Sequence, residues 1–278
     1  MKGIAYPHLQ ERSEHPVTLT DLARLKQTGE KIACLTVYDA SFAAVEDRAG
    51  VDIVLVGDSL GNVIQGTDST VPVNMDEMVY HSRCAAAGLY RPLLMTDLPF
   101  LSYATKHQAL ESSKRLMQEG RAQMVKFEGG EDYAGVVEHL STRGVPVCGH
   151  IGLMPQLIHK MGGFKVQGRE QDAAKQMLQD ARVLEEAGVD MLLVECVPSS
   201  LGAEIAANAK IPVIGIGAGP DMDGQILVVY DIVNLSAGRK PRFVKNFMPE
   251  AGSIEGAVEA YVAAVKDQSY PAPEHCFT

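Results

Sequence analysis

Residues 93–130, LLMTDLPFLSYATKHQALESSKRLMQEGRAQMVKFEGG, contain an apolar run at 93–96, a helical pattern at 106–119 and a second apolar run at 123–127. Both runs are nearly continuous in apolar residues rather than alternating, which is typical of strands buried on both faces of a parallel sheet. Thr105 stands at the N-cap position of the helix between them. The stretch therefore predicts a strand–helix–strand unit with parallel strands.

The same order extends in both directions along the chain. Further strands are predicted at 31–37, 52–56, 145–149, 191–194 and 212–216, with a weaker eighth at 226–229. Helices are predicted at 41–49, 75–88 (capped by Asn74), 132–142, 172–187 and 201–209. The predicted strand ends recur about every 32 residues, close to the roughly 31 per unit of an eightfold barrel of about 250 residues. We therefore predict a (βα)8 TIM barrel, with an open doubly wound sheet as the alternative.

Two helices flank this repeating part. The first, at 18–28, begins with Thr18 and Asp21 in the positions of a capping box, and the second covers 253–266 before a proline-containing tail at 270–278. We expect residues 1–16 to form a mobile extension, and residues 17–278 to form a single barrel domain. The polar start resembles no secretory signal, and no apolar run is long enough for a membrane span.

The composition narrows the class of function. With 46% hydrophobic and 22% charged residues among 278, the chain is typical of soluble globular proteins. The formal net charge of −10 argues against nucleic acid or an anionic membrane as the partner. The five scattered cysteines form no Cys-x-x-Cys pair, which fits the reducing cytoplasm.

Polar side chains stand at the ends of successive predicted strands. In a barrel these ends meet at the mouth that carries the active site. The glycine-rich turn at 215–219, GIGAG, lacks the dinucleotide-binding spacing, and we expect close backbone packing beside a ligand there. The polar strand-end residues are Asp58, Ser59, Asp97, Lys126, Glu128, His150 and Glu195.

The chemistry of these groups suggests a metal and a 2-oxo acid. Asp58, Asp97 and Glu128 are hard oxygen donors without a His or Cys cluster, a set that suits Mg²⁺. A metal held there can bind a 2-oxo acid through its keto and carboxylate oxygens. Lys126 lies two residues before Glu128, on the same strand face, and would pair either with the substrate's charged oxygens or with a neighbouring aspartate.

Two further residues are candidates for proton transfer. Glu195 lies between Val194 and Cys196, and an acid in this apolar setting suits a general base. The alternative is a core carboxylate paired with a lysine or arginine. His150 could donate a hydrogen bond to a substrate oxyanion, or it could be a structural histidine.

Eight ordered segments carry a resemblance to a known family. The chain is similar, from about 18 to 277, to the 3-methyl-2-oxobutanoate hydroxymethyltransferases, also called ketopantoate hydroxymethyltransferases. The segments lie at 56–73 (VGDSLGNVIQGTDSTVPV), 96–100 (TDLPF), 124–130 (MVKFEGG), 145–156 (VPVCGHIGLMPQ), 162–169 (GGFKVQGR), 192–198 (LLVECVP), 211–219 (IPVIGIGAG) and 241–247 (PRFVKNF).

The resemblance implies a cytoplasmic (βα)8 barrel that transfers a one-carbon unit from 5,10-methylenetetrahydrofolate to 3-methyl-2-oxobutanoate. The product is 2-dehydropantoate, on the route to pantothenate and coenzyme A. The resemblance also implies Mg²⁺ and a homodecamer of two pentameric rings.

Roles carried over from the family fall on matching residues of this chain. Asp58 and Asp97 match the metal-binding aspartates, which also line the oxo-acid site, and Glu128 matches the metal-linked glutamate. Ser59 and Lys126 match the groups that hold the oxo acid. Glu195 matches the proton acceptor, and His150 is a possible accessory residue.

Two other classes remain as alternatives. A Mg²⁺-dependent carbon–carbon lyase or phosphomutase acting on 2-oxo acids could share the barrel and the acidic site. A non-catalytic metal- or metabolite-binding protein is the second alternative, although a binder has no evident need for a base at Glu195.

Overall fold

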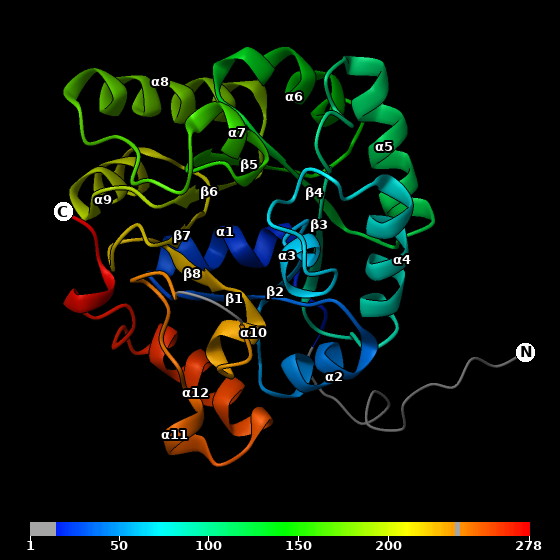
Figure 1. Cartoon of the computed structure of the whole chain (residues 1–278). Helices are drawn as coiled ribbons and strands as arrows, with labels where there is room; N and C mark the ends of the chain where they lie inside the picture. The colour runs from blue at the N-terminus through cyan, green and yellow to red at the C-terminus, as the bar shows by residue number, and fades with distance from the viewer. Residues whose placement is uncertain (1–14, 237–239) are drawn as a thin grey trace, which may run out of the picture.

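The computed structural model describes residues 15–236 and 240–278, and within them eight parallel strands close into a barrel (Figure 1). Each strand pairs with the next, and β1 also pairs with β8. The predicted barrel is confirmed, and the open sheet is excluded because it would leave two unpaired edges. The strands are β1 (Ile32–Thr36), β2 (Ile53–Val56), β3 (Leu93–Asp97), β4 (Met124–Glu128), β5 (Val147–Gly152), β6 (Met191–Glu195), β7 (Val213–Ile216) and β8 (Gly224–Leu227).

An outer layer of helices surrounds the strands (Figure 1). Its longer members are α2 (Ala40–Arg48), α4 (Met75–Ala86), α5 (Lys106–Gln118), α6 (Ala134–Ser141), α8 (Gln171–Ala187), α9 (Ser199–Asn208) and α12 (Ile254–Lys266). Short helices lie in the loops: α3 (Leu60–Val63), α7 (Ile158–Met161), α10 (Val229–Ile232) and α11 (Met248–Ala251). Three 3₁₀ turns, η2 (Glu131–Tyr133), η3 (Pro155–Leu157) and η4 (Pro273–His275), complete the described elements.

The barrel wall separates two apolar layers. In β1, Ile32 and Cys34 belong to the cluster inside the barrel, whereas Ala33 and Leu35 pack outward against the helices. This follows from the alternation of side chains along a strand. Strands buried on both sides need apolar residues at most positions, which is why the sequence runs are nearly continuous.

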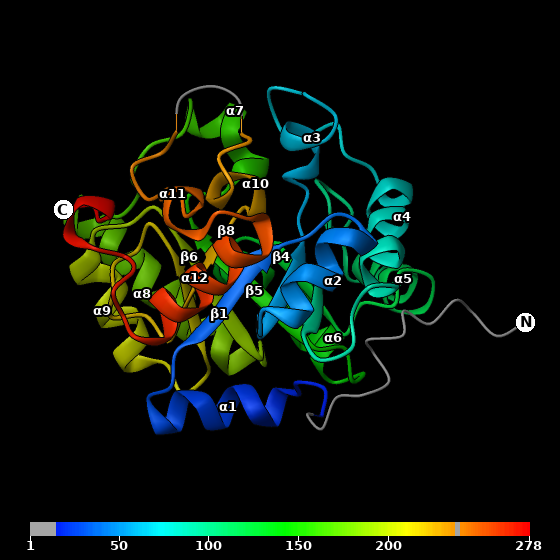
Figure 2. The same ribbon diagram turned by 90° about the horizontal axis from the view of Figure 1, so that it is seen from below.

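Helix α1 (Leu19–Thr28) closes the barrel at the end where the strands begin (Figure 2). Its predicted capping box is present: the Thr18 hydroxyl accepts from the Asp21 amide, and the Asp21 carboxylate accepts from the Thr18 amide. Leu22 and Leu25 extend into the interior cluster. The opposite end of the barrel is thereby left for the strand-end polar residues.

Several predicted boundaries were wrong. Strand β5 ends at Gly152, so that His150 lies within the strand and not after it. Strand β8 begins at Gly224 rather than 226, where Gly224 pairs with Ile32 of β1. A glycine is needed at this position because a Cβ would lie 2.3 Å from the Ile32 carbonyl oxygen. No helix lies between β7 and β8 in the described chain, and residues 217–223 join the two strands directly.

The sequence predicts two segments at the ends of the chain, an N-terminal extension and a C-terminal helix with a tail. Residues 1–14 of the expected mobile extension lie outside the described residues. The C-terminal helix and tail are present as α12 and η4. Of the helices in the described ranges, none combines the length and apolar character that crossing a membrane requires.

Candidate active site

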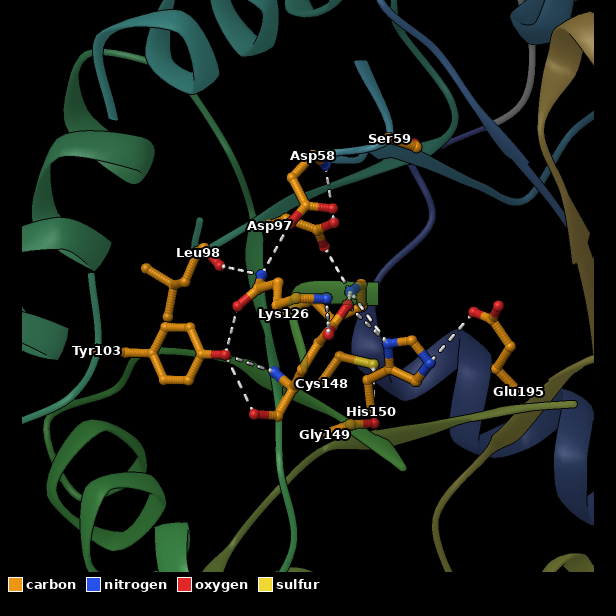
Figure 3. Close-up of polar contacts among 12 residues, drawn as sticks. Asp58, Ser59, Asp97, Leu98, Tyr103, Lys126, Cys148, Gly149, His150 and Glu195 are labelled. Atoms are coloured by element: carbon orange, nitrogen blue, oxygen red, sulfur yellow. Dashed lines mark hydrogen bonds and ion pairs between the residues drawn. The ribbon is translucent and has the colours of Figure 1, made fainter. Parts of the chain in front are cut away.

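The polar residues predicted from the strand ends meet at one mouth of the barrel. Asp58, Ser59, Asp97, Lys126, Glu128, His150 and Glu195 all line a cavity of about 910 Å³. They come together because parallel strands end on the same side of a barrel. Figure 3 shows His150 between Glu195 on one side and the carboxylates with Lys126 on the other. The structure thus groups the predicted residues, while their roles remain predictions.

Lys126 is a buried cation held among carboxylates. Its Nζ lies 2.8 Å from Asp97 Oδ1 and 3.9 Å from Glu128 Oε1. Burial alone would lower the pKa of Lys126, but the charges of Asp97, Glu128 and Asp58 raise it above its usual value. Lys126 therefore stays charged, and it both pairs with an aspartate and faces the cavity.

The carboxylates nevertheless exceed the positive charge around them. Asp58 is buried, and its backbone amide donates to Asp97 Oδ2 at 3.0 Å. Burial, followed by the charges of Asp97 and Glu128, raises the pKa of Asp58 well above its usual range. An excess of buried negative charge favours binding of a cation.

The carboxylates of Asp58 and Asp97 are the oxygen donors that could hold Mg²⁺ at this site. Within the described ranges, no three His, Cys, Asp or Glu side chains are gathered into a complete metal site. Asp58 and Asp97 come from the adjacent strand ends of β2 and β3, and Mg²⁺ commonly takes only one or two carboxylates and keeps water or substrate oxygens in its other positions. The residues therefore fit Mg²⁺ as a two-carboxylate site.

Both oxygens of Glu128 are held by protein groups, as are both oxygens of Asp97, whereas in the described chain only one oxygen of Asp58 is engaged, by Gln156. Glu128 Oε2 accepts from the Gln156 amide at 2.9 Å, and Oε1 lies 3.4 Å from His150 Nδ1. Burial would raise the pKa of Glu128, but the contacts with His150, Lys126 and Gln156 lower it. Glu128 is thus ionised and largely engaged, which suits an indirect link to a metal.

His150 joins Glu128 to Glu195. Its Nε2 lies 3.4 Å from Glu195 Oε2, opposite the contact of Nδ1 with Glu128. Burial and Lys126 would lower the pKa of His150, but the two glutamates raise it above the usual value. The protonated ring can donate from both nitrogens. In the described chain Glu195 has this histidine as its ion-pair partner, rather than the lysine or arginine of the structural alternative.

Close approach of β5 and β6 fixes the backbone at Glu195. Gly152 has a φ of 95°, and a Cβ there would lie 2.2 Å from the Glu195 carbonyl oxygen. That oxygen accepts from the Leu153 amide at 2.9 Å. The Glu195 side chain is 14% exposed and faces the cavity (Figure 3).

Sequence reasoning missed the residues that hold Asp58. The Gln156 Nε2 donates to Asp58 Oδ2 and to the Leu98 carbonyl, both at 2.9 Å. The Tyr103 hydroxyl donates to Gln156 Oε1 at 2.6 Å. Gln156 ends the GHIGLMPQ segment, but an amide there suggests no chemistry until its partners are seen.

The glycines of GIGAG serve the close packing that the sequence predicts. Gly217 and Gly219 have φ values of 61° and 95°. A Cβ on Gly217 would lie 2.8 Å from the Phe243 ring, and one on Gly219 would lie 2.7 Å from Ser199. The turn therefore lets the start of α9 and the chain after α10 pack beside the cavity.

Solved structures with this arrangement have little sequence in common with the chain. An oxaloacetate acetylhydrolase has a TM-score of 0.61 and 14% identity, over 87% of this chain and 90% of that chain. A phosphonopyruvate hydrolase, solved with oxalate and Mg²⁺, has a TM-score of 0.59 and 13% identity, over 76% and 80%. At this identity the likeness shows the barrel fold alone.

Sequence relatives are far closer. A 3-methyl-2-oxobutanoate hydroxymethyltransferase of Alkalilimnicola ehrlichii is 56% identical over 266 residues, which are 96% of each chain. One of Nitrosococcus oceani is 53% identical over 255 residues, 92% of this chain and 97% of the relative. The family model described as ketopantoate hydroxymethyltransferase matches residues 16–273. The chain therefore belongs to the ketopantoate hydroxymethyltransferase family, a family of transferases.

Proposed function

We propose that this transferase acts in the cytoplasm, in pantothenate biosynthesis, and moves the one-carbon unit of 5,10-methylenetetrahydrofolate onto C3 of 3-methyl-2-oxobutanoate. One water is consumed, and the products are 2-dehydropantoate and tetrahydrofolate. The observation that carries the proposal is the placement of Glu195 across one cavity from the Asp58–Asp97 pair, with Lys126 and His150 between them. Family membership over most of the chain supports the choice of reaction.

Asp58 and Asp97 would hold Mg²⁺, and Glu128 would be linked to it indirectly. Bound there, the ion would polarise the keto oxygen of the oxo acid and so acidify C3–H. The charge excess around Asp58 supports this assignment.

The remaining steps belong to side chains of this protein. Lys126 and Ser59 would hold the charged oxygens of the oxo acid, and Tyr38 orients Ser59 through a 2.8 Å contact between their hydroxyl oxygens. The Glu195 carboxylate would accept the C3 proton, while His150 orients that carboxylate. The resulting enolate carbon would form a bond to the methylene carbon of the folate. The bonds from that carbon to the folate nitrogens would break, the consumed water would supply the hydroxyl oxygen and the protons that the nitrogens need, and tetrahydrofolate would leave. Lys126 would offset the negative charge on the enolate oxygen, because charges interact strongly in a buried site.

The first test is proton NMR of 3-methyl-2-oxobutanoate in D₂O with the protein and Mg²⁺, without folate. We expect the C3 signal to disappear as deuterium enters, and Glu195→Gln to slow this by about 10²–10⁴-fold while still binding the oxo acid. Glu204→Gln, an exposed change on α9, is the matched control.

Two results would count against the proposal. Normal exchange in Glu195→Gln would reject this residue as the base. A persistent C3 signal in the wild type, followed by no product when methylenetetrahydrofolate is added, would reject the reaction and revive the lyase and binder alternatives.

We also propose the homodecamer of two pentameric rings that the family resemblance implies. Exposed apolar side chains such as Tyr80 (54%), Leu101 (57%) and Leu235 (64%) are compatible with contacts between subunits. Sedimentation velocity should give about 300 kDa for ten chains of 29.9 kDa. A species of one or two chains at micromolar concentration would refute this assembly.

A further inference from the structure

The cavity is larger than a small oxo acid needs. Its volume is about 910 Å³, near the upper end of the range of about 300–1,000 Å³ that holds drug-sized ligands. The carboxylates, Lys126 and His150 form its floor. The lining also includes residues of the 162–169 loop, the segment after α10 and the C-terminal tail, none of which the steps above use.

This second part of the lining carries positive charge. Lys165, Lys240 and Arg242 all line the cavity, although the whole chain has a net charge of −10. Lys240 is within electrostatic reach of Asp231, another lining residue. In the described parts of the chain, no carboxylate forms an ion pair with Lys165 or Arg242. Arg242 Nη1 donates to the Cys276 carbonyl at 3.2 Å, so Lys165 and the remaining guanidinium N–H groups of Arg242 are available to an anionic ligand.

Aromatic side chains accompany the cations. Phe164, next to Lys165, is 65% exposed and lines the cavity. The guanidinium carbon of Arg242 lies 5.9 Å from the centroid of the Phe277 ring. The Phe277 carbonyl accepts from the Ser199 amide at 3.0 Å, so the tail that carries this ring is fastened to the start of α9. Exposed aromatic faces stack on planar ring systems.

The loop that carries Lys165 is tied to the strand end that carries Glu195. The Gln167 amide donates to the Cys196 carbonyl at 2.8 Å. Figure 2 shows α7, which leads into this loop, at the end of the barrel opposite α1. A ligand held on the loop and the tail would therefore approach the oxo acid from the β6 side of the mouth.

We infer that Phe164, Lys165, Arg242 and Phe277 form a binding subsite for an elongated ligand with a planar ring system and carboxylates. The ring stacks on the phenylalanines, and Lys165 and Arg242 bind the carboxylates. Arginine suits this task because its planar fork can stack on Phe277 and still donate to a carboxylate. The inference rests on the proposed function, in which a reduced folate with its glutamate tail is the ligand of this chemistry.

The test compares Lys165→Gln and Arg242→Gln with Lys160→Gln in the full-length protein. Lys160 is an exposed cation in the same loop region that does not line the cavity, so it controls for the loss of one charge. We expect the KM for methylenetetrahydrofolate to rise about tenfold in each of the first two variants, with a much smaller change in the KM for the oxo acid. Lys160→Gln should match the wild type.

Titration with tetrahydrofolate carrying one or three glutamates gives a readout that needs no turnover. The wild type should bind the triglutamate more tightly, and Lys165→Gln and Arg242→Gln should reduce that advantage. Equal affinities of wild type and both variants for either folate would overturn the subsite, as would equal losses in Lys160→Gln.

Failure of the subsite and failure of the proposed function can be told apart. If the wild type binds tetrahydrofolate through these cations but leaves the C3 proton of the oxo acid in place and forms no product with methylenetetrahydrofolate, the subsite stands and the proposed reaction fails. If C3 exchange and transfer proceed while the folate KM is unchanged in both variants, the reaction stands and the subsite is wrong.

Discussion

Gln156 shows how a residue without catalytic chemistry can set the geometry of a site. Its side-chain amide donates to Asp58 and to the Leu98 carbonyl, and its oxygen accepts from Tyr103. Its backbone amide donates to Glu128. With one Asp58 oxygen engaged by the amide, Asp58 has its other oxygen to offer a cation. We therefore regard Gln156 as a positioning residue for the carboxylates.

Replacing Gln156 with methionine should weaken Mg²⁺ binding with little change in side-chain volume. Changing a residue that orients a metal ligand typically lowers metal affinity or activity by about 10–100-fold. We expect the Mg²⁺ concentration for half-maximal C3 exchange to rise about tenfold, and Mg²⁺ titration of the protein to show the same shift. Tyr103→Phe, which removes the hydroxyl that orients the amide, should act in the same direction and more weakly. A lower melting temperature with an unchanged Mg²⁺ requirement would mean that Gln156 is only structural.

At the level of elements, local signals were predicted better than close approaches between segments. The caps at Thr18, Asn74 and Thr105 are all present, because a cap depends on residues three positions apart. The start of β8 at Gly224 was missed because it depends on the neighbouring β1 backbone. Periodicity detects apolar side chains, and a glycine required by a neighbouring strand leaves no such signal.

Helix α1 contributes stability at the end of the barrel away from the site. Leu22 is 1% exposed and packs in the interior cluster. We expect Leu22→Ala to lower the free energy of unfolding by about 2–5 kcal/mol, because it leaves a cavity among buried side chains. At a temperature where the variant is fully folded, C3 exchange should be unchanged. Urea unfolding and the NMR assay measure the two quantities, and a large loss of exchange in folded protein would contradict this separation.

Helix α2 contains a buried acid that the proposed reaction does not use. Glu46 is fully buried, and neither carboxylate oxygen has a hydrogen-bond partner in the described chain. Burial, with a smaller effect of Asp39, raises the pKa of Glu46 well above its ordinary value of 4.5. A raised pKa in the fold favours the protonated form. The contribution of Glu46 to stability is complete at pH values below its pKa in the unfolded chain. It is lost as the pH rises through its pKa in the folded protein.

Glu46→Gln should therefore stabilise the protein more at pH 8 than at pH 5. We expect a gain of about 1–3 kcal/mol at pH 8, since the uncharged amide avoids burying an unpaired carboxylate, and a smaller difference at pH 5. Urea unfolding at both pH values measures this, with the exposed Glu204→Gln as control. An effect independent of pH would show that the charge of Glu46 is not the cause.

At the scale of the whole molecule, closure of the barrel explains why the sequence predicts which residues line the candidate active site. Every parallel strand ends at the same mouth, so a polar residue at a strand end can be placed without knowing its contacts. Gln156 could not be placed in this way, because it comes from the 3₁₀ turn η3 and reaches across β3 and β4 to Asp58. The interaction of His150 with both glutamates likewise depends on the register of β4, β5 and β6.

The carboxylates at the mouth of the barrel are expected to lower the stability of the metal-free protein while they serve its function. Asp58, Asp97 and Glu128 are buried together, and the raised pKa of Asp58 reflects burial and the charges of the other two. Asp58→Asn removes one of these charges, and the asparagine oxygen can still accept from Gln156. We expect the metal-free variant in EDTA to unfold at a temperature a few degrees higher than the wild type, by about 2–4 °C per kcal/mol gained.

Saturating Mg²⁺ should reverse that order, because an ion that binds only the folded state stabilises it by an amount that grows with the logarithm of its concentration relative to its dissociation constant. The melting temperature of the wild type should rise with Mg²⁺, that of Asp58→Asn should rise little, and C3 exchange should be lost in the variant. Scanning calorimetry in EDTA and in Mg²⁺ measures both effects. If Asp58→Asn melts below the wild type in EDTA, the carboxylates of the mouth are already compensated without a metal. Their burial would then be a structural feature of the barrel rather than a cost that ion binding relieves.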